Sequence, residues 1–228
     1  MFDRGYVMSK RPRKNRRPHY FLGVDLGQKN DYTAIAVLRC EVYAKGKEIE
    51  RTDRVFELTD YERVPLQTRY PQIVTHVSKL YRRMEKEAGE LFLLVDRTGI
   101  GRAIWDMFQE AGLDPVGVTM TAGHQVTDGD QPYTCNVPKI DLVHSLLRLL
   151  EQDRIKISTD NQFFLPFRRE LSEYKIKPSL SRPGSVTLEA ARDGDHDDLI
   201  IAASMCTWAA TSSNFSRYAP GPSVSFVC

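Results

Sequence analysis

The sequence predicts a mixed α/β fold in which three antiparallel strands come first and parallel strands separated by helices come after. Short apolar runs separated by polar turns occupy the first 60 residues. Helical and strand patterns alternate from residue 71 onward, and a long apolar helix ends the pattern near residue 210. A doubly wound nucleotide-binding fold would alternate strand and helix from the start, which this chain does not do.

The antiparallel part is predicted at residues 20–26, 33–42 and about 49–58. The first run is apolar and ends in an acid, and a polar turn follows at residues 27–31. The second run is rich in Ala, Ile and Val, whereas the third alternates apolar and polar residues, as a strand with one solvated face does. Gly46 centres the hairpin turn that joins them.

The second half of the chain is predicted to alternate between helices and strands. Helices are recognised by apolar residues at a spacing of three and four, and strands by short apolar runs. In chain order, we expect a helix at 73–84 ending near Gly89, a strand at 91–95, a helix from the 98–101 turn to about 111, a strand at 116–120, a loop at 121–136, helices at 139–151 and 163–174, a break at 178–184, a strand at 186–190 and an apolar helix at 197–210.

The overall composition is that of a globular protein. Of the 228 residues, 41% are hydrophobic and 27% are charged, and the length suits one domain with a core. No apolar run approaches the roughly 18 to 20 residues that cross a bilayer. The basic N-terminus is not followed by the apolar segment of a secretory signal. We therefore expect a cytoplasmic protein without a membrane partner.

The four cysteines do not form a recognisable site. Cys40, Cys135, Cys206 and Cys228 lie far apart, and none belongs to a C-x-x-C pair, which argues against a zinc ribbon. In a reducing compartment a disulfide framework is also not expected. We predict free thiols, mostly in the core.

The positive charge is concentrated at the N-terminus. Residues 1–19 hold seven Lys or Arg and one acid, a local charge of +6, so the rest of the chain carries −4. We predict a disordered basic arm at 1–19, a folded domain at 20–210 and a flexible tail at 211–228. The arm either contacts a polyanion or is a solvated linker.

Four aspartates stand where carboxylates are unusual. Asp25 interrupts an apolar strand, Asp96 ends the strand at 91–95, and Asp197 and Asp198 open the last helix. An acid in such a position loses hydration and must gain a partner. Divalent cations are natural partners for carboxylates that converge from distant segments.

Each aspartate also has a simpler interpretation. Asp25 could begin the turn after the first strand, Asp96 could cap the next helix, and Asp197 and Asp198 could complement a helix dipole. In the predicted fold, however, the strands that end at Asp25 and Asp96 lie side by side, and the last helix starts at the same edge of the sheet. This convergence favours a metal site. Gly99 and Gly101 are expected to allow the tight turn after Asp96.

Four segments of this chain form a recognisable series: GVDLG at 23–27 followed by DYTAI at 31–35, VDRTGIG at 95–101, VPKIDL at 137–142 and GDHDDL at 194–199. They span most of residues 20–210. Together they resemble the nuclease domains of viral (phage) terminase large subunits, which belong to the ribonuclease H-like, RuvC-like superfamily. The order of the predicted elements is also that of ribonuclease H-like folds.

The resemblance implies a two-metal-ion endodeoxyribonuclease that uses Mg²⁺ or Mn²⁺. Carried over by position, Asp25 would bind both ions, Asp96 would hold one, and Asp197, Asp198 or both would complete the site. Asp195 and His196 would orient a carboxylate or a water, although His196 could equally be a capping or surface residue.

The resemblance also implies double-stranded DNA as substrate, with concatemeric viral DNA cut during genome packaging in the cytoplasm of the host cell. Lys139, at a helix start, could meet a phosphate, and Arg16 and Arg17 of the arm could contact the DNA backbone. A packaging ATPase, a small terminase and a portal would be the partners. No G-x-x-x-x-G-K-[ST] loop is present, so this sequence does not itself supply the ATPase motor.

Three other functions compete with this one. A RuvC-like junction resolvase shares the fold and the acids but cuts branched DNA as a dimer. A non-catalytic DNA-binding or motor-docking subunit would gain nothing from buried negative charge. A sugar-kinase or actin-like phosphate binder would need two lobes, for which the chain is too short.

Overall fold

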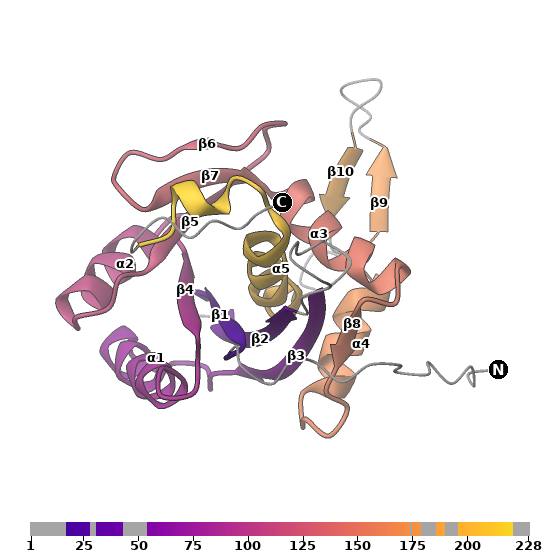
Figure 1. The fold of residues 1–228 in the computed structure, drawn as a ribbon. Helices are drawn as coiled ribbons and strands as arrows, with labels where there is room; N and C mark the ends of the chain where they lie inside the picture. Colours follow the sequence, from indigo (N-terminus) through magenta and orange to yellow (C-terminus); the bar gives the residue numbers. More distant parts are fainter. Residues whose placement is uncertain are drawn as a thin grey trace, which may run out of the picture.

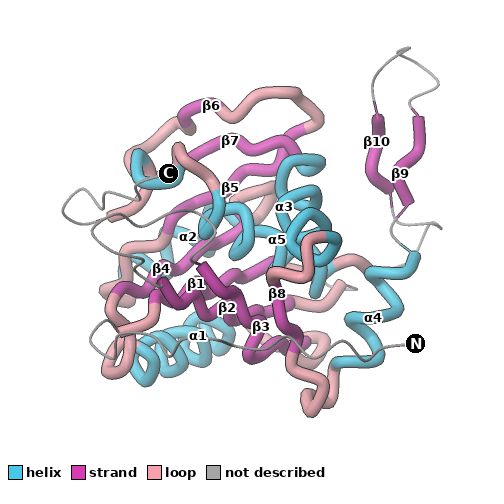
Figure 2. Tube along the Cα trace, turned by 45° about the vertical axis from the view of Figure 1, so that its right-hand side comes forward, coloured by secondary structure: helices cyan, strands magenta, loops and turns pink. Residues whose placement is uncertain are grey.

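The computed structural model describes residues 17–27, 31–42, 54–173, 175–178, 186–189 and 196–220. An eight-stranded sheet runs through the molecule in the order β6-β7-β5-β4-β1-β2-β3-β8 (Figures 1 and 2). Its strands are β1 His19–Asp25, β2 Ala34–Val42, β3 Arg54–Arg63, β4 Glu90–Asp96, β5 Val116–Thr121, β6 Thr127–Asp128, β7 Thr134–Pro138 and β8 Ile155–Ile157. The helices are α1 Tyr70–Met84, α2 Gly101–Glu110, α3 Lys139–Glu151, α4 Phe164–Glu173 and α5 Asp198–Thr211, and a separate hairpin pairs β9 Lys175–Pro178 with β10 Val186–Glu189.

The pairing of the strands confirms the predicted fold class. β1, β2 and β3 are joined antiparallel, whereas β4, β5 and β7 continue from β1 as parallel neighbours. β8 extends the other edge parallel to β3, and β6 pairs antiparallel with β7. Because β1 and β4 are parallel neighbours, their carboxyl ends meet at one edge of the sheet.

Helices cover both faces of the sheet. α3 and α5 lie on one face, and α1 and α2 lie on the other, next to β4 (Figure 1). Each face has its own apolar core: one includes Phe21, Leu38 and Leu146, and the other includes Leu22 and Trp105. No helix in the described ranges is long and apolar enough to cross a membrane.

α5 is the central helix of the fold. Nearly all of its residues are buried, as expected for a helix that is apolar on every side. It can lie close to β1 because position 23 is a glycine. A Cβ there would stand 2.3 Å from the Ala202 carbonyl oxygen and 2.8 Å from Cys206 Sγ, distances that would force the helix away from the strand.

The predicted boundaries differ from the structure at β3. The strand was expected at 49–58, but it continues to Arg63, and residues 49–53 lie outside the described residues. A bulge explains the difference: Leu58 pairs with Leu38 and Asp60 with Val37, so Thr59 is the extra residue. This break in the alternation makes the following residues look like a loop.

Short strands were also missed. The segment 121–136 was expected to be a loop, yet it contains β6 and the start of β7, and β8 was not predicted. β7 lies within the sheet, where Thr134, Cys135 and Val137 are buried between β5 and β6. Strands of two to five residues lack the repeated pattern from which strands are recognised.

Part of the segment predicted as a flexible tail packs on the core. The 3-10 helix Phe215–Arg217 buries Phe215 against Phe92 and Trp208, with ring centroids 5.3 and 6.0 Å apart. Residues 221–228 lie outside the described residues, as does most of the predicted arm.

Three of the cysteines are free and buried, as predicted: Cys40, Cys135 and Cys206. Cys228 is outside the described residues.

Candidate metal centre

The carboxylates of Asp25 and Asp96 lie side by side at the carboxyl ends of β1 and β4. The register pairs Val24 with Val95, so the next residue on each strand is an aspartate. Beside the effect of burial, the charge of Asp96 raises the pKa of Asp25. Two carboxyl groups this close repel each other unless one of them carries a proton or a cation lies beside them.

The electrostatics of this pair favour that proton. Burial raises the pKa of Asp25 well above its ordinary value, and repulsion from Asp96, Asp198 and Asp197 raises it further. Burial also raises the pKa of Asp96, while hydrogen bonds from Thr98 oppose the rise. Negative charge is therefore crowded here, and a proton or a metal cation would relieve the repulsion.

The turn after Asp96 fixes its orientation. The Thr98 amide donates to Asp96 Oδ1 at 2.8 Å. Gly99 has φ of 61°, and a Cβ on Gly101 would lie 2.0 Å from the Asp96 carbonyl oxygen. The two glycines thus allow the tight turn, as predicted from the sequence.

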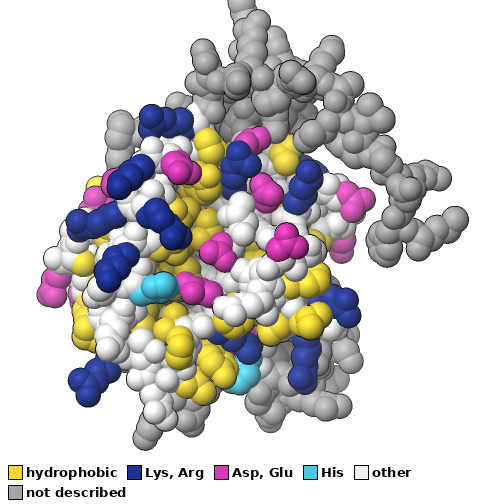
Figure 3. Space-filling view, turned by 90° about the horizontal axis from the view of Figure 1, so that it is seen from below, with side chains coloured by type: hydrophobic (Ala, Val, Ile, Leu, Met, Phe, Trp, Pro, Cys, Tyr) yellow, Lys and Arg dark blue, Asp and Glu magenta, His cyan; other side chains and the backbone are white. Residues whose placement is uncertain are grey.

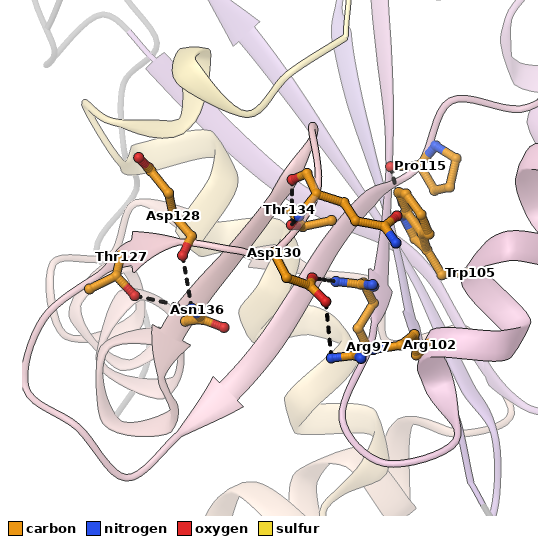
Figure 4. Close-up of polar contacts among 10 residues, drawn as sticks. Arg97, Arg102, Trp105, Pro115, Thr127, Asp128, Asp130, Thr134 and Asn136 are labelled. Carbon is orange, nitrogen blue, oxygen red and sulfur yellow. Dashed lines mark hydrogen bonds and ion pairs between the residues drawn. The ribbon is translucent and has the colours of Figure 1, made fainter.

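The next residue, Arg97, anchors this end of β4 (Figure 4). Its Nη1 lies 2.7 Å from Asp130 Oδ1, and its guanidinium carbon lies 4.8 Å from the centre of the Trp105 ring. Arg102 contacts the other oxygen of Asp130 at 3.1 Å. The residue that follows Asp96 is thereby tied to α2 and to the loop before β7.

Asp197 and Asp198 reach the same edge from the start of α5. Asp197 occupies the N-cap position but makes no capping hydrogen bond. Its Oδ2 instead lies 2.7 Å from Lys139 Nζ, at the first residue of α3. The sequence placed Lys139 at a helix start beside the acids, and the structure brings these residues together.

Asp198 is buried against two basic side chains. Its Oδ2 lies 3.8 Å from Arg63 Nη2 and 3.7 Å from His196 Nδ1. Burial raises the pKa of Asp198 to about 6, Arg63 and His196 oppose the rise, and Asp197 and Asp31 add to it. Among the described residues, Oδ2 of Asp198 has no hydrogen-bond donor.

Aromatic contacts surround this carboxylate. The guanidinium carbon of Arg63 lies 4.8 Å from the centre of the Tyr32 ring, and the His196 ring meets Tyr32 edge-on at 5.4 Å. His196 thus lies beside Asp198, where the sequence placed a residue that could orient a carboxylate.

Arg63 and Glu170 were not identified from the sequence. Arg63 Nη2 lies 2.6 Å from Glu170 Oε1, and the Ile200 amide donates to Glu170 Oε2 at 3.0 Å. Helical spacing places Glu170 on the same face as Phe163 and Phe167, and an acid on an apolar helix face is the signal that could have revealed it. No comparable signal marks Arg63.

The chemistry of these side chains fits a divalent cation, although their positions in the structure do not form a complete coordination shell. Within the described residues, no three His, Cys, Asp or Glu side chains form a ready metal cluster. Asp197 is paired with Lys139, and Asp25 and Asp96 repel each other. Hard oxygen ligands, mutual repulsion among the carboxylates and the buried Asp198 oxygen without a donor match the needs of Mg²⁺ or Mn²⁺.

The remaining predicted residues do not lie in this cluster. Arg17 precedes β1, about 25 Å from Asp25 at the rise of a strand, and its Nη1 donates to the Lys86 carbonyl at 3.5 Å. Arg16 and Asp195 lie outside the described residues.

Lys and Arg side chains gather along the left side of the face in Figure 3, the side on which α1 lies in Figure 1.

Comparisons with known proteins identify the fold by structure alone. No protein-family model matches the sequence, and no curated protein is detectably similar to it. The large terminase nuclease from thermophilic phage G20c matches with a TM-score of 0.54 and 17% identity, over 87% of this chain and 84% of that chain. A structure of the same nuclease with bound magnesium matches with a TM-score of 0.53 and 17% identity, over 86% of this chain and 82% of that chain.

A human virus provides a further structural match. The human cytomegalovirus terminase nuclease domain, soaked in Mn, has a TM-score of 0.51 and 15% identity, with 88% of each chain covered. The chain therefore has the ribonuclease H-like fold of terminase nuclease domains, as the sequence motifs predicted.

Proposed function

We propose that this chain is a metal-dependent endonuclease that hydrolyses phosphodiester bonds of double-stranded DNA. The proposal rests chiefly on the convergence of Asp25, Asp96 and Asp198 from β1, β4 and α5, where burial and repulsion among the carboxylates raise the pKa of Asp25. A protein that only bound DNA would have no use for crowded negative charge at this edge, since phosphates repel it.

Asp25, Asp96, Asp198 and Asp197 are the residues that would hold Mg²⁺ or Mn²⁺, and two ions are proposed. When bound, such ions supply an activated water and stabilise the charge on the leaving oxygen. Solved structures of the same fold include one with bound magnesium and one soaked in Mn. The chain's own contribution is to hold the carboxylates in place through the Thr98 amide, Lys139 and the first turn of α5.

The biological setting is also part of the proposal. Cutting concatemeric viral DNA during packaging would occur in the host cytoplasm, with an ATPase motor, a small terminase and a portal as partners. Terminase nucleases of the same fold support this setting.

The direct test is cleavage of DNA by the purified chain. Supercoiled plasmid, linear duplex and a four-way junction are incubated with Mg²⁺ or Mn²⁺, and matched reactions contain EDTA. We expect metal-dependent nicking or cutting of plasmid and duplex that EDTA stops. Cutting of the junction alone would indicate a resolvase, and DNA binding without cutting under any metal would contradict the proposal.

Lys139 is expected to contact a DNA phosphate when substrate is bound. The Lys139→Met substitution should raise KM for duplex DNA more than it lowers kcat, and should reduce the slope of log affinity against log salt by about 1. Steady-state cleavage at several salt concentrations measures both effects. Lys156→Met, an exposed lysine on β8, is the matched control. An unchanged KM and salt slope would assign Lys139 to the Asp197 ion pair alone.

A further inference from the structure

An ion pair between two distant elements lies beneath the first turn of α5. Arg63 comes from the end of β3 and Glu170 from α4, and their side chains are 16% and 4% exposed. Removing two charges from water is costly, and an apolar pair of similar size is often as stable. Their presence next to a candidate metal ligand therefore suggests a role beyond stability.

Glu170 caps the helix that carries Asp197 and Asp198. Its Oε2 accepts the amide of Ile200, the third residue of α5, at 3.0 Å. The N-cap residue Asp197 would ordinarily supply this bond, but its carboxylate is paired with Lys139. A carboxylate from a neighbouring helix thus takes the place of the local cap, leaving Asp197 facing the metal centre.

Glu170 also determines where the Arg63 guanidinium lies. Arg63 Nη2 is at hydrogen-bond distance from Glu170, 2.6 Å, but is 3.8 Å from Asp198 Oδ2. That Asp198 oxygen is buried, and no donor among the described residues bonds to it. An oxygen in this state is the kind of ligand that a divalent cation can take without first displacing a hydrogen bond.

We propose that Glu170 is a positioning residue that holds Arg63 away from Asp198 and so keeps the Asp198 carboxylate open to a divalent cation. The inference rests on the metal-dependent function proposed above. Without the Glu170 charge, the guanidinium would close on Asp198, since an arginine readily forms paired hydrogen bonds with a carboxylate. Arg63 would then compete with the metal for the same oxygen.

The test uses Mn²⁺ binding by isothermal titration calorimetry at pH 8.5, without DNA, so that Glu170 is ionised although burial raises its pKa to about 8. Glu170→Gln keeps the shape but has one acceptor oxygen where the carboxylate has two. Its affinity for Mn²⁺ should fall by roughly tenfold or more, the usual effect of losing a partner of a metal ligand. The double variant Arg63→Met with Glu170→Gln removes the competing guanidinium and should return to within about threefold of the wild type.

Restoration by the second substitution separates positioning from a simple structural role. If Glu170 only stabilised the fold, loss of Arg63 as well would leave Mn²⁺ binding no better. Cleavage provides a second readout: in Glu170→Gln the Mn²⁺ concentration for half-maximal rate should rise, while the rate at saturating Mn²⁺ stays within about threefold of the wild type. Arg39→Met with Glu57→Gln, an ion pair of 3.2 Å between β2 and β3, is the matched control.

Equal Mn²⁺ affinity in wild type and Glu170→Gln, or a double variant as weak as the single one, would overturn the inference. If Glu170→Gln does not fold, Glu170→Asp shortens the reach of the carboxylate, and its Mn²⁺ affinity should fall in the same direction; an unchanged affinity would overturn the inference. A wild-type chain that neither binds Mn²⁺ nor cleaves DNA would instead refute the proposed function itself.

Discussion

Asp25→Asn is expected to abolish metal-dependent DNA cleavage while making the metal-free protein more stable. Asp25 stands at the centre of the carboxylates, so its loss should reduce the cleavage rate by roughly three orders of magnitude or more. The same substitution removes a half-buried carboxyl whose pKa is raised by burial and by three neighbouring aspartates. Above the ordinary pKa of an aspartate, folding must either crowd this charge among its neighbours or take up a proton, so at pH 8 the amide should raise the melting temperature of the metal-free chain.

Loss of cleavage together with a higher melting temperature is a combination that misfolding cannot produce. A variant that had lost activity through misfolding would melt at a lower temperature. Asp106→Asn, at an exposed position of α2, is the control and should change neither property. Cleavage by Asp25→Asn at the wild-type rate would show that Asp25 is not the central ligand.

Metal ions are expected to stabilise the folded chain strongly at pH 8 and weakly at pH 5. The pKa of Asp25 and of Asp96 is raised by burial, and burial raises the pKa of Asp198 to about 6 from 3.8. A carboxyl with a raised folded-state pKa adds stability below its unfolded pKa and loses it as the pH rises through the folded pKa. The metal-free melting temperature should therefore fall as the pH rises from about 4 through 6.

A bound cation replaces the lost protons, because it offsets the same repulsion. Mn²⁺ at about 100 times its Kd adds roughly 2.7 kcal/mol, which is a shift of about 5 to 10 °C for a domain of this size. At pH 5 protons compete for the carboxylates, so the shift should shrink. Thermal melts with Mn²⁺ or with NaCl of equal ionic strength measure the difference. Equal shifts at both pH values would mean that the cation binds elsewhere.

Glu170 also contributes to the pH dependence of the stability of the folded chain. Burial raises its pKa to about 8, while the Ile200 amide and Arg63 oppose the rise. Both of its oxygens accept bonds from N–H donors, an arrangement that suits the ionised form. Its proton is therefore held less firmly than burial alone would imply.

The local pattern of the sequence determined the fold class and the carboxylates of the candidate site. Asp25 and Asp96 are visible because each ends an apolar strand, and Asp197 and Asp198 because they precede a helix that is apolar on every side. These signals lie within a few residues of each aspartate. The order of the strands then placed the acids at one edge, and the pairing of Val24 with Val95 agrees.

Only the tertiary structure decided what surrounds those carboxylates. The Arg63–Glu170 pair joins residues 107 positions apart, and the Lys139–Asp197 pair joins residues 58 positions apart. No local pattern specifies which side chain fills the space beneath α5, because that depends on how α4 and β3 pack against the helix. Sequence periodicity reports which face of an element is buried, whereas the partner of a buried charge is selected by packing between elements.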